Sequence, residues 1–107
     1  MALRRDVRYQ VRCPATFVVD GKPGDGVTFN LSRGGCAIET EMFTAVDDPI
    51  SLQIIVSSQS TPIMIELGKV RWSTRVEFGV EFMVVENKSK RQLDDFLLAV
   101  AKEKLTS

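Results

Sequence analysis

The chain has 107 residues, of which 44% are hydrophobic and 26% charged, so it is long enough for one domain with a modest core and too short for two. Its 14 basic and 14 acidic side chains cancel, whereas proteins that bind a nucleic-acid backbone broadly carry a basic surplus. Composition therefore argues against DNA or RNA as a partner. Residues 1–12 nevertheless hold four arginines against one acid, and such local positive charge suits a small anionic ligand.

Cys13 and Cys36 are too far apart for a redox Cys-x-x-Cys pair, and the chain has no histidine for an ordinary zinc site. Each falls at an apolar position of a predicted strand, so we expect two buried free thiols and no metal or cofactor. Residues 1–20 lack the apolar run of a signal peptide, and no stretch approaches the ~18 apolar residues of a membrane helix. The expectation is a soluble, cytoplasmic protein without membrane insertion.

Alternating apolar and polar residues predict a series of short strands. The first covers residues 11–19, and Pro14 places it at an edge or a start. Turn-forming residues 20–26 separate it from a second alternating run at 27–32. Two glycines then indicate a hairpin-like reversal at residues 32–35.

Four further strands follow this reversal. Alternation resumes at residues 36–40 and again at 50–56. The next strand covers 63–72, and its apolar face changes parity at Gly68, where we expect a bulge or a bend. The clearest alternation, at 76–84, completes a set of six strands.

The hydrophobic period changes after the sixth strand. Apolar side chains three and four residues apart predict an amphipathic helix over residues 87–105. Asn87 or Ser89 is suited to cap its start, and Lys102 and Lys104 suit the C-terminal end of the helix dipole. Six strands and a terminal helix predict a mostly β fold, an antiparallel barrel or sandwich with the helix packed on it.

The predicted organisation is one domain covering residues 1–107. Residues 1–9 are expected to form a flexible, arginine-bearing segment, since charged chain ends are usually mobile. Residues 10–85 form the barrel, and 87–105 the helix. No repeat, low-complexity segment or long linker interrupts the domain.

Two separated segments together suggest an anion site. Arg4 and Arg8 are four residues apart, so both can turn toward one ligand, and the guanidinium fork suits phosphate oxygens and purine edges. Asn30 and Ser32 supply hydrogen-bonding groups on one face of the second strand. Gly35 lets the backbone come close where a Cβ would obstruct. The pattern indicates a phosphorylated, base-containing ligand.

These segments resemble the two motifs of the PilZ domain, the bacterial receptor module for cyclic di-GMP. That family pairs an Arg-x-x-x-Arg segment before the first strand with an (Asp/Asn)-x-Ser-x-x-Gly turn after the second. Arg4 and Arg8 stand at the first motif, and Asn30, Ser32 and Gly35 stand at the second.

The resemblance extends over nearly all of the chain. Residues 68–72 and 78–82 are similar to the family's late hairpin. The resemblance implies a six-stranded antiparallel PilZ-type barrel with a C-terminal α-helix, and a non-enzymatic receptor. It also implies that binding folds the arginine segment over the barrel and that an unidentified effector protein reads the change.

The resemblance also implies roles for the site residues. Arg4 and Arg8 would bind phosphates and guanines, with Arg5 assisting, while Asn30 and Ser32 would contact a guanine or the sugar-phosphate ring. Asn30 replaces the Asp of many members, which removes a carboxylate able to accept from guanine N1 and N2.

Two other residues bear on ligand number and base contact. In the family that the chain resembles, a further Arg just before the first motif favours an intercalated pair of ligands. Leu3 stands at that position, so the resemblance implies one ligand per site, although Arg5 could stack a second guanine. Trp72 ends an apolar strand and is expected in the core rather than beside a base. Arg12 is expected to be exposed and unliganded.

Two alternative functions remain open. One is a constitutive protein-interaction module of the same fold, in which the arginines grip an acidic partner and nucleotide is irrelevant. The other is a barrel that binds RNA or single strands, which should show aromatic stacking platforms and a basic stripe. One Trp, one Tyr and zero net charge argue against the second alternative. No acid–base pair suggests an enzyme.

Overall fold

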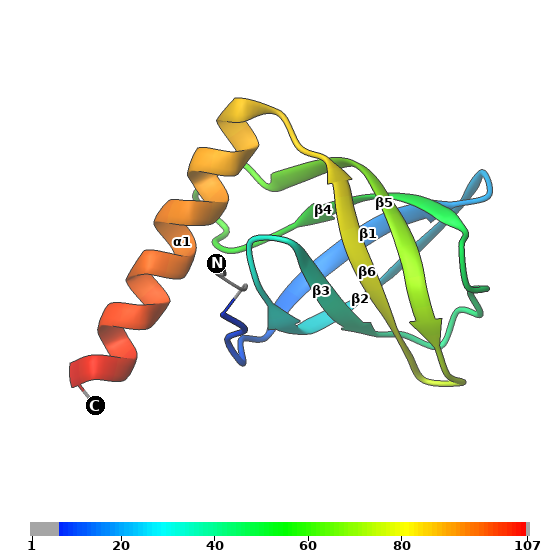
Figure 1. The fold of residues 1–107 in the computed structure, drawn as a ribbon, viewed down its shortest axis with the longest axis horizontal. Coiled ribbons are helices and arrows are strands. Elements are labelled where there is room, and N and C mark those ends of the chain that lie inside the picture. Colours follow the sequence, from blue (N-terminus) through cyan, green and yellow to red (C-terminus); the bar gives the residue numbers. More distant parts are fainter. Residues whose placement is uncertain (1–6, 107) are drawn as a thin grey trace, which may run out of the picture.

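The computed structural model describes residues 7–106 and shows a closed barrel of six antiparallel strands with one helix at its end (Figure 1). The elements in chain order are β1 (Cys13–Val19), β2 (Lys22–Leu31), β3 (Gly35–Glu39), β4 (Pro49–Ile54), β5 (Ile63–Ser73), β6 (Glu77–Val84) and α1 (Asn87–Thr106). The strand order around the barrel is β1-β2-β3-β6-β5-β4. The predicted mostly β fold, six strands followed by a helix, is confirmed.

The turn between β1 and β2 is tighter than the sequence predicted. Asp20 and Gly21 both have positive φ, 53° and 74°, as the centre of a two-residue type I′ hairpin requires. Val19 therefore pairs directly with Lys22, and the two strands stay in register to Cys13 and Thr28. The prediction of a loop over residues 20–26 was wrong, because two residues with positive φ complete the reversal and the later glycines and proline lie within β2.

The core fills the interior of the barrel and continues under the helix. Phe17 and Phe78 meet edge to face in it, with ring centroids 5.3 Å apart. Cys13 and Cys36 are buried free thiols, as predicted. The other buried members are Ala15, Val19, Leu31, Ile38, Ile50, Leu52, Ile54, Ile63, Ile65, Val70, Val80, Leu93 and Leu97.

Register shifts bend the long strand β5. One lies between Leu67 and Gly68 in the pairing with β6, which confirms the predicted irregularity at Gly68. A second lies between Val70 and Trp72 and was not predicted. Bulges of this kind increase twist and curvature, so they help a strand of 11 residues follow the barrel wall.

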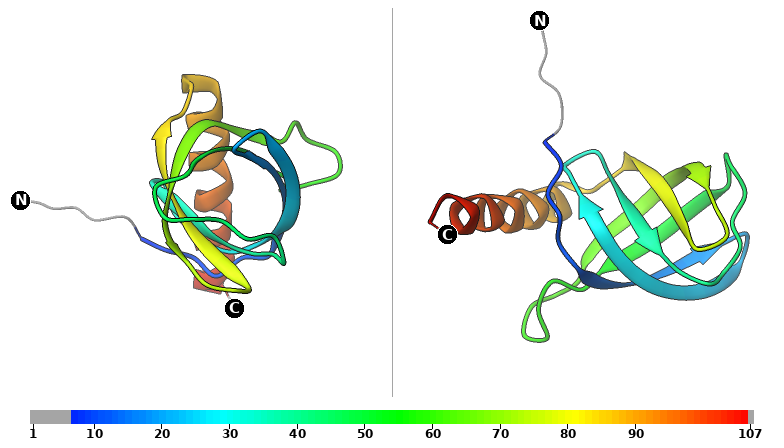
Figure 2. Two further views of the ribbon diagram at one scale, coloured as in Figure 1. Left: turned by 90° about the vertical axis from the view of Figure 1, so that its right-hand side faces the viewer. Right: turned by 90° about the horizontal axis from the view of Figure 1, so that it is seen from below.

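The helix α1 extends from one end of the barrel and does not cover its wall (Figure 2). Leu93 and Leu97 enter the core, and Asp94 forms an ion pair of 2.9 Å with Arg33. No helix within residues 7–106 combines the length and the hydropathy needed to cross a membrane.

The start of α1 differs from the sequence prediction. The amide of Lys90 donates to the carbonyl of Glu86 at 2.9 Å, so Glu86 occupies the capping position. Asn87 is already helical, and Ser89 is buried within the first turn. The prediction of Asn87 or Ser89 as N-cap was therefore wrong by one to three residues.

The Phe17–Phe78 contact generates a stability prediction. Phe78→Ala removes a ring that is 1% exposed, so it should lower the free energy of unfolding by about 3–5 kcal/mol in urea titrations. Phe43→Ala is the matched control, because Phe43 is 77% exposed and its loss should change stability by less than about 0.5 kcal/mol. Equal losses in the two variants would contradict the assignment of the core.

Burial of Cys36 generates a pH prediction. Burial raises the pKa of its thiol from 9.0 to about 12, while the charge of Arg8 and a hydrogen bond from Thr28 act in the opposite direction. Between pH 9 and 12 the unfolded chain ionises this thiol and the folded protein does not, so the free energy of unfolding falls as pH rises. The slope from this group is at most about 1.4 kcal/mol per pH unit.

Cys36→Ala is the variant that isolates this effect. Urea titrations between pH 8 and 10.5 should show a shallower loss of stability for the variant than for the original protein. Identical pH slopes for the two proteins would contradict the assignment.

Candidate functional site

A pocket of about 560 Å³ opens on the outer wall formed by β2, β3, β6 and β5. Its size is typical of small-molecule sites. It contains two of the predicted site residues, Arg8 and Asn30. The remaining lining residues are Gly34, Cys36, Ala37, Arg71, Trp72, Gly79, Val80, Glu81 and Phe82.

Small residues form the floor of this pocket. One row across the four strands runs from Asn30 to Ala37, Gly79 and Trp72, because each is the register partner of the next. A Cβ on Gly79 would overlap Nε1 and Cε2 of the Trp72 indole, so the ring lies against the backbone of Gly79. The floor is therefore a shallow slot with an aromatic ring at one edge, suited to a planar group.

Trp72 was predicted in the core, and that prediction was wrong. The side chain is 41% exposed and lines the pocket. The cause is the register shift between Val70 and Trp72, which breaks the strict alternation that would turn every second residue inward. The sequence held one signal, Gly79, since a glycine within a regular strand marks a close approach of another group.

Arg8 and Asn30 meet at the opposite edge of the slot. Arg8 Nη1 donates to Asn30 Oδ1 at 2.9 Å. Two hydrogen bonds between Tyr9 and Leu31, of 2.9 and 3.0 Å, hold the N-terminal segment against the end of β2. This bridge brings Arg8, the second arginine of the first predicted motif, beside Asn30 of the second. Arg4 and Arg5 lie outside the described residues.

Ser32 and Gly35 shape the turn between β2 and β3. Ser32 is fully buried, and its hydroxyl donates to the Gly35 carbonyl at 3.3 Å and accepts from the Gly34 amide at 3.2 Å. A Cβ on Gly35 would overlap the carbonyl oxygen of Val80, so only glycine lets β3 and β6 pair here. Neither residue lines the pocket, and their contact with a ligand stays a prediction.

An ion pair forms the wall beside Trp72. Arg71 Nε and Nη2 both lie 2.5 Å from Glu81 Oε1, and Nη1 lies 3.8 Å from Asp47 Oδ1. Sequence reasoning singled out neither Arg71 nor Glu81 as a site residue. The likeness to the family's late hairpin covered both positions but gave neither a role, because a charged residue on the outer face of a strand is usually only solvated.

Arg12 is exposed, as predicted, and pairs with Glu39 at 2.8 Å. Their hydrogen bond raises the pKa of Arg12 and lowers the pKa of Glu39. Arg12 is not among the residues that line the pocket between Arg8 and Trp72. Arg12 is therefore a control position that carries the same charge as Arg8.

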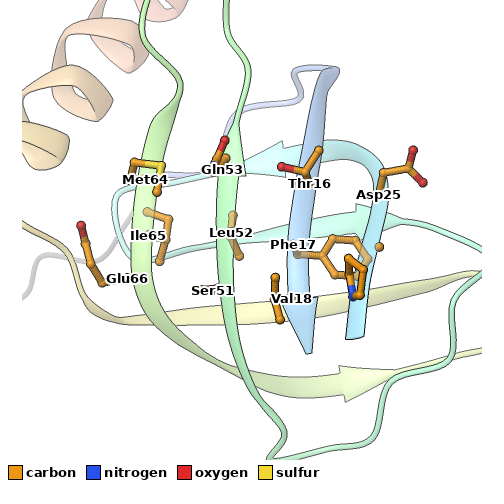
Figure 3. A pocket seen from close by; sticks show the side chains of 12 residues that line it. Thr16, Phe17, Val18, Asp25, Ser51, Leu52, Gln53, Met64, Ile65 and Glu66 are labelled. Carbon is orange, nitrogen blue, oxygen red and sulfur yellow. The ribbon is translucent and has the colours of Figure 1, made fainter. Parts of the chain in front are cut away.

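A second groove, of about 510 Å³, lies on the opposite wall, formed by β2, β1, β4 and β5 (Figure 3). Thr16 and Gln53 line it, with the carboxylates of Asp25 and Glu66. The described residues of this groove include no arginine or lysine. It lacks positive charge for an anion, which favours the Arg8 pocket as the functional site. Within residues 7–106 no cluster of three His, Cys, Asp or Glu side chains could hold a metal ion.

Comparison with known proteins agrees with this architecture. An inhibitor of motility from Bacillus subtilis, MotI/DgrA, has a TM-score of 0.78 and 15% identity over 97% of this chain, which spans about half, 54%, of that protein. The PilZ domain with c-di-GMP of YcgR from Escherichia coli has a TM-score of 0.75 and 12% identity, and the match covers 94% of this chain and 93% of that domain.

A third structure, the PilZ domain of CeSA from a cellulose-synthesizing bacterium, has a TM-score of 0.70 and 11% identity, with 89% of this chain and 98% of that domain covered. At these identities the structures show a shared fold. No curated protein matches the chain. The PilZ domain family model matches residues 2–99. The chain therefore belongs to the PilZ domain family.

Proposed function

We propose that this chain is a non-enzymatic receptor that binds cyclic di-GMP in the pocket between Arg8 and Trp72. The observation that carries the proposal is the arrangement of that slot. An arginine and a carboxamide stand at one edge, and an exposed indole stands at the other. Family membership supports it, and so does the likeness to a YcgR domain described with c-di-GMP.

Each edge of the slot supplies a different part of the binding energy. Arg8 is placed to donate to a phosphate or to the O6 and N7 acceptors of a guanine. Trp72 offers its exposed face for base stacking, which contributes about 1–3 kcal/mol per base. Asn30 orients Arg8 and can contact the ligand, while Ser32 and Gly35 hold the turn. We propose that Arg4 and Arg5 complete the phosphate clamp.

The output of such a receptor passes through another protein. We propose that the ligand draws the arginine segment over the pocket and that an effector protein reads the altered surface. One structural relative is named an inhibitor of motility, which is compatible with an adaptor. The alternative is a module of the same fold that binds an acidic protein partner without nucleotide.

Isothermal titration with cyclic di-GMP, beside cyclic di-AMP and GTP, tests the receptor. Arg8→Ala removes a charge-assisted contact and should weaken cyclic di-GMP binding by about 10- to 100-fold, and adding Arg4→Ala should weaken it further. Arg12→Ala should bind as the original protein does, because Arg12 pairs with Glu39 outside the pocket. No heat with any nucleotide would contradict the receptor and favour the protein-interaction module.

Trp72 is the single tryptophan, so its fluorescence reports on the pocket alone. Stacking of a guanine should quench its emission and shift the maximum as water leaves the exposed face. Trp72→Ala should weaken binding by about 5- to 100-fold. Heat of binding without a change in emission would place the ligand elsewhere on the protein.

A further inference from the structure

We infer that Glu81 selects guanine in this pocket by accepting hydrogen bonds from the Watson–Crick edge of the base. The inference rests on the proposed function, since it names the group that reads the base of the same ligand. It concerns a residue that neither motif of the sequence includes.

The hydrogen-bond donors of guanine favour a carboxylate as their partner. The Watson–Crick edge of guanine presents two neighbouring donors, N1–H and the N2 amino group, whereas adenine presents one donor beside an acceptor. An ionised carboxylate only accepts, and its two oxygens offer about four lone-pair sites. A carboxylate therefore complements guanine and leaves adenine with an unpaired acceptor.

Asn30 does not supply the acceptors for both guanine donors. Its Oδ1 already accepts from Arg8 Nη1 at 2.9 Å, and the other end of the carboxamide donates. Glu81 is the one carboxylate among the described residues that line the pocket. The acceptor that an Asp at position 30 would supply is thus available from the other wall.

Glu81 lies where a stacked base would end. On β6 it follows Gly79 by two residues, so both lie on the outer face, roughly 7 Å apart along the strand. The Trp72 indole packs against Gly79. A base that stacks on the indole over the small floor therefore brings its edge toward the carboxylate of Glu81.

Arg71 positions this carboxylate. Both of its hydrogen bonds, from Nε and Nη2, go to Oε1 of Glu81. Within residues 7–106 no hydrogen bond is made to Oε2, so two lone pairs remain for the two guanine donors. Arg71 also offsets the charge of Glu81, which limits repulsion of the ligand phosphates.

Glu81→Gln tests the inference, with cyclic di-GMP and cyclic di-IMP as probes in isothermal titration. Hypoxanthine keeps N1–H, O6 and N7 of guanine and lacks only the N2 amino group. We expect the variant to lose about tenfold or more in affinity for cyclic di-GMP. Its loss of affinity for cyclic di-IMP should be smaller by a factor of about three or more. Its preference for cyclic di-GMP over cyclic di-AMP should fall as well.

Glu77→Gln is the matched control, since Glu77 lies on the outer side of the same strand but does not line the pocket. Glu77→Gln removes the same charge and should change neither the affinity for cyclic di-GMP nor the affinity for cyclic di-IMP. If Glu81 served only to neutralise Arg71, its removal would instead raise the affinity for all three dinucleotides, and that result would overturn the inference.

The possible failures are distinguishable. If the original protein binds none of the dinucleotides, the receptor itself is refuted. If it binds cyclic di-GMP and Glu81→Gln keeps the same affinity and the same preference, the receptor stands and the role of Glu81 is refuted. Circular dichroism and urea titration of Glu81→Gln establish that the variant is folded.

Discussion

Closure of the barrel is the constraint on which the rest of the structure depends. Six strands close only if each pairs on both sides, and the longest of them, β5, must bend to reach both β4 and β6. The bend is made by register shifts. The shift next to Trp72 interrupts the alternation of inward and outward residues, so the same irregularity that closes the barrel turns an indole and Arg71 toward the pocket.

Much of the fold was predictable from the sequence because alternation and the later change of period report burial directly. The limits of that method appear at β2, where glycines and a proline in a strand have the composition of a loop. They also appear at Trp72, where one register shift reverses the side of a residue. Arg8 and Asn30 could be proposed as site residues because their motifs are local, and the structure brings them to one pocket.

The other wall of the site was not predictable, for a physical reason. Arg71 and Glu81 are ten residues apart on different strands, and they meet only through the pairing of β5 with β6. The small floor at Ala37 and Gly79 has the same origin, since its flatness is a property of neighbouring strands and not of either alone. Residues that come together only through strand pairing cannot be recognised from short sequence motifs, so this part of the candidate site required the structure.

The closed barrel also limits how another protein can engage the domain. Every one of the six described strands has a neighbour on each side, and the longest stretches outside the pairing with the second neighbour are residues 22–26 of β2 and 63–66 of β5. Recognition by strand addition, a common way to bind an extended peptide, needs a row of free backbone amides and carbonyls at an edge. Strand addition to this domain is therefore limited to short stretches such as these two, and any wider contact would use side chains, loops or the helix.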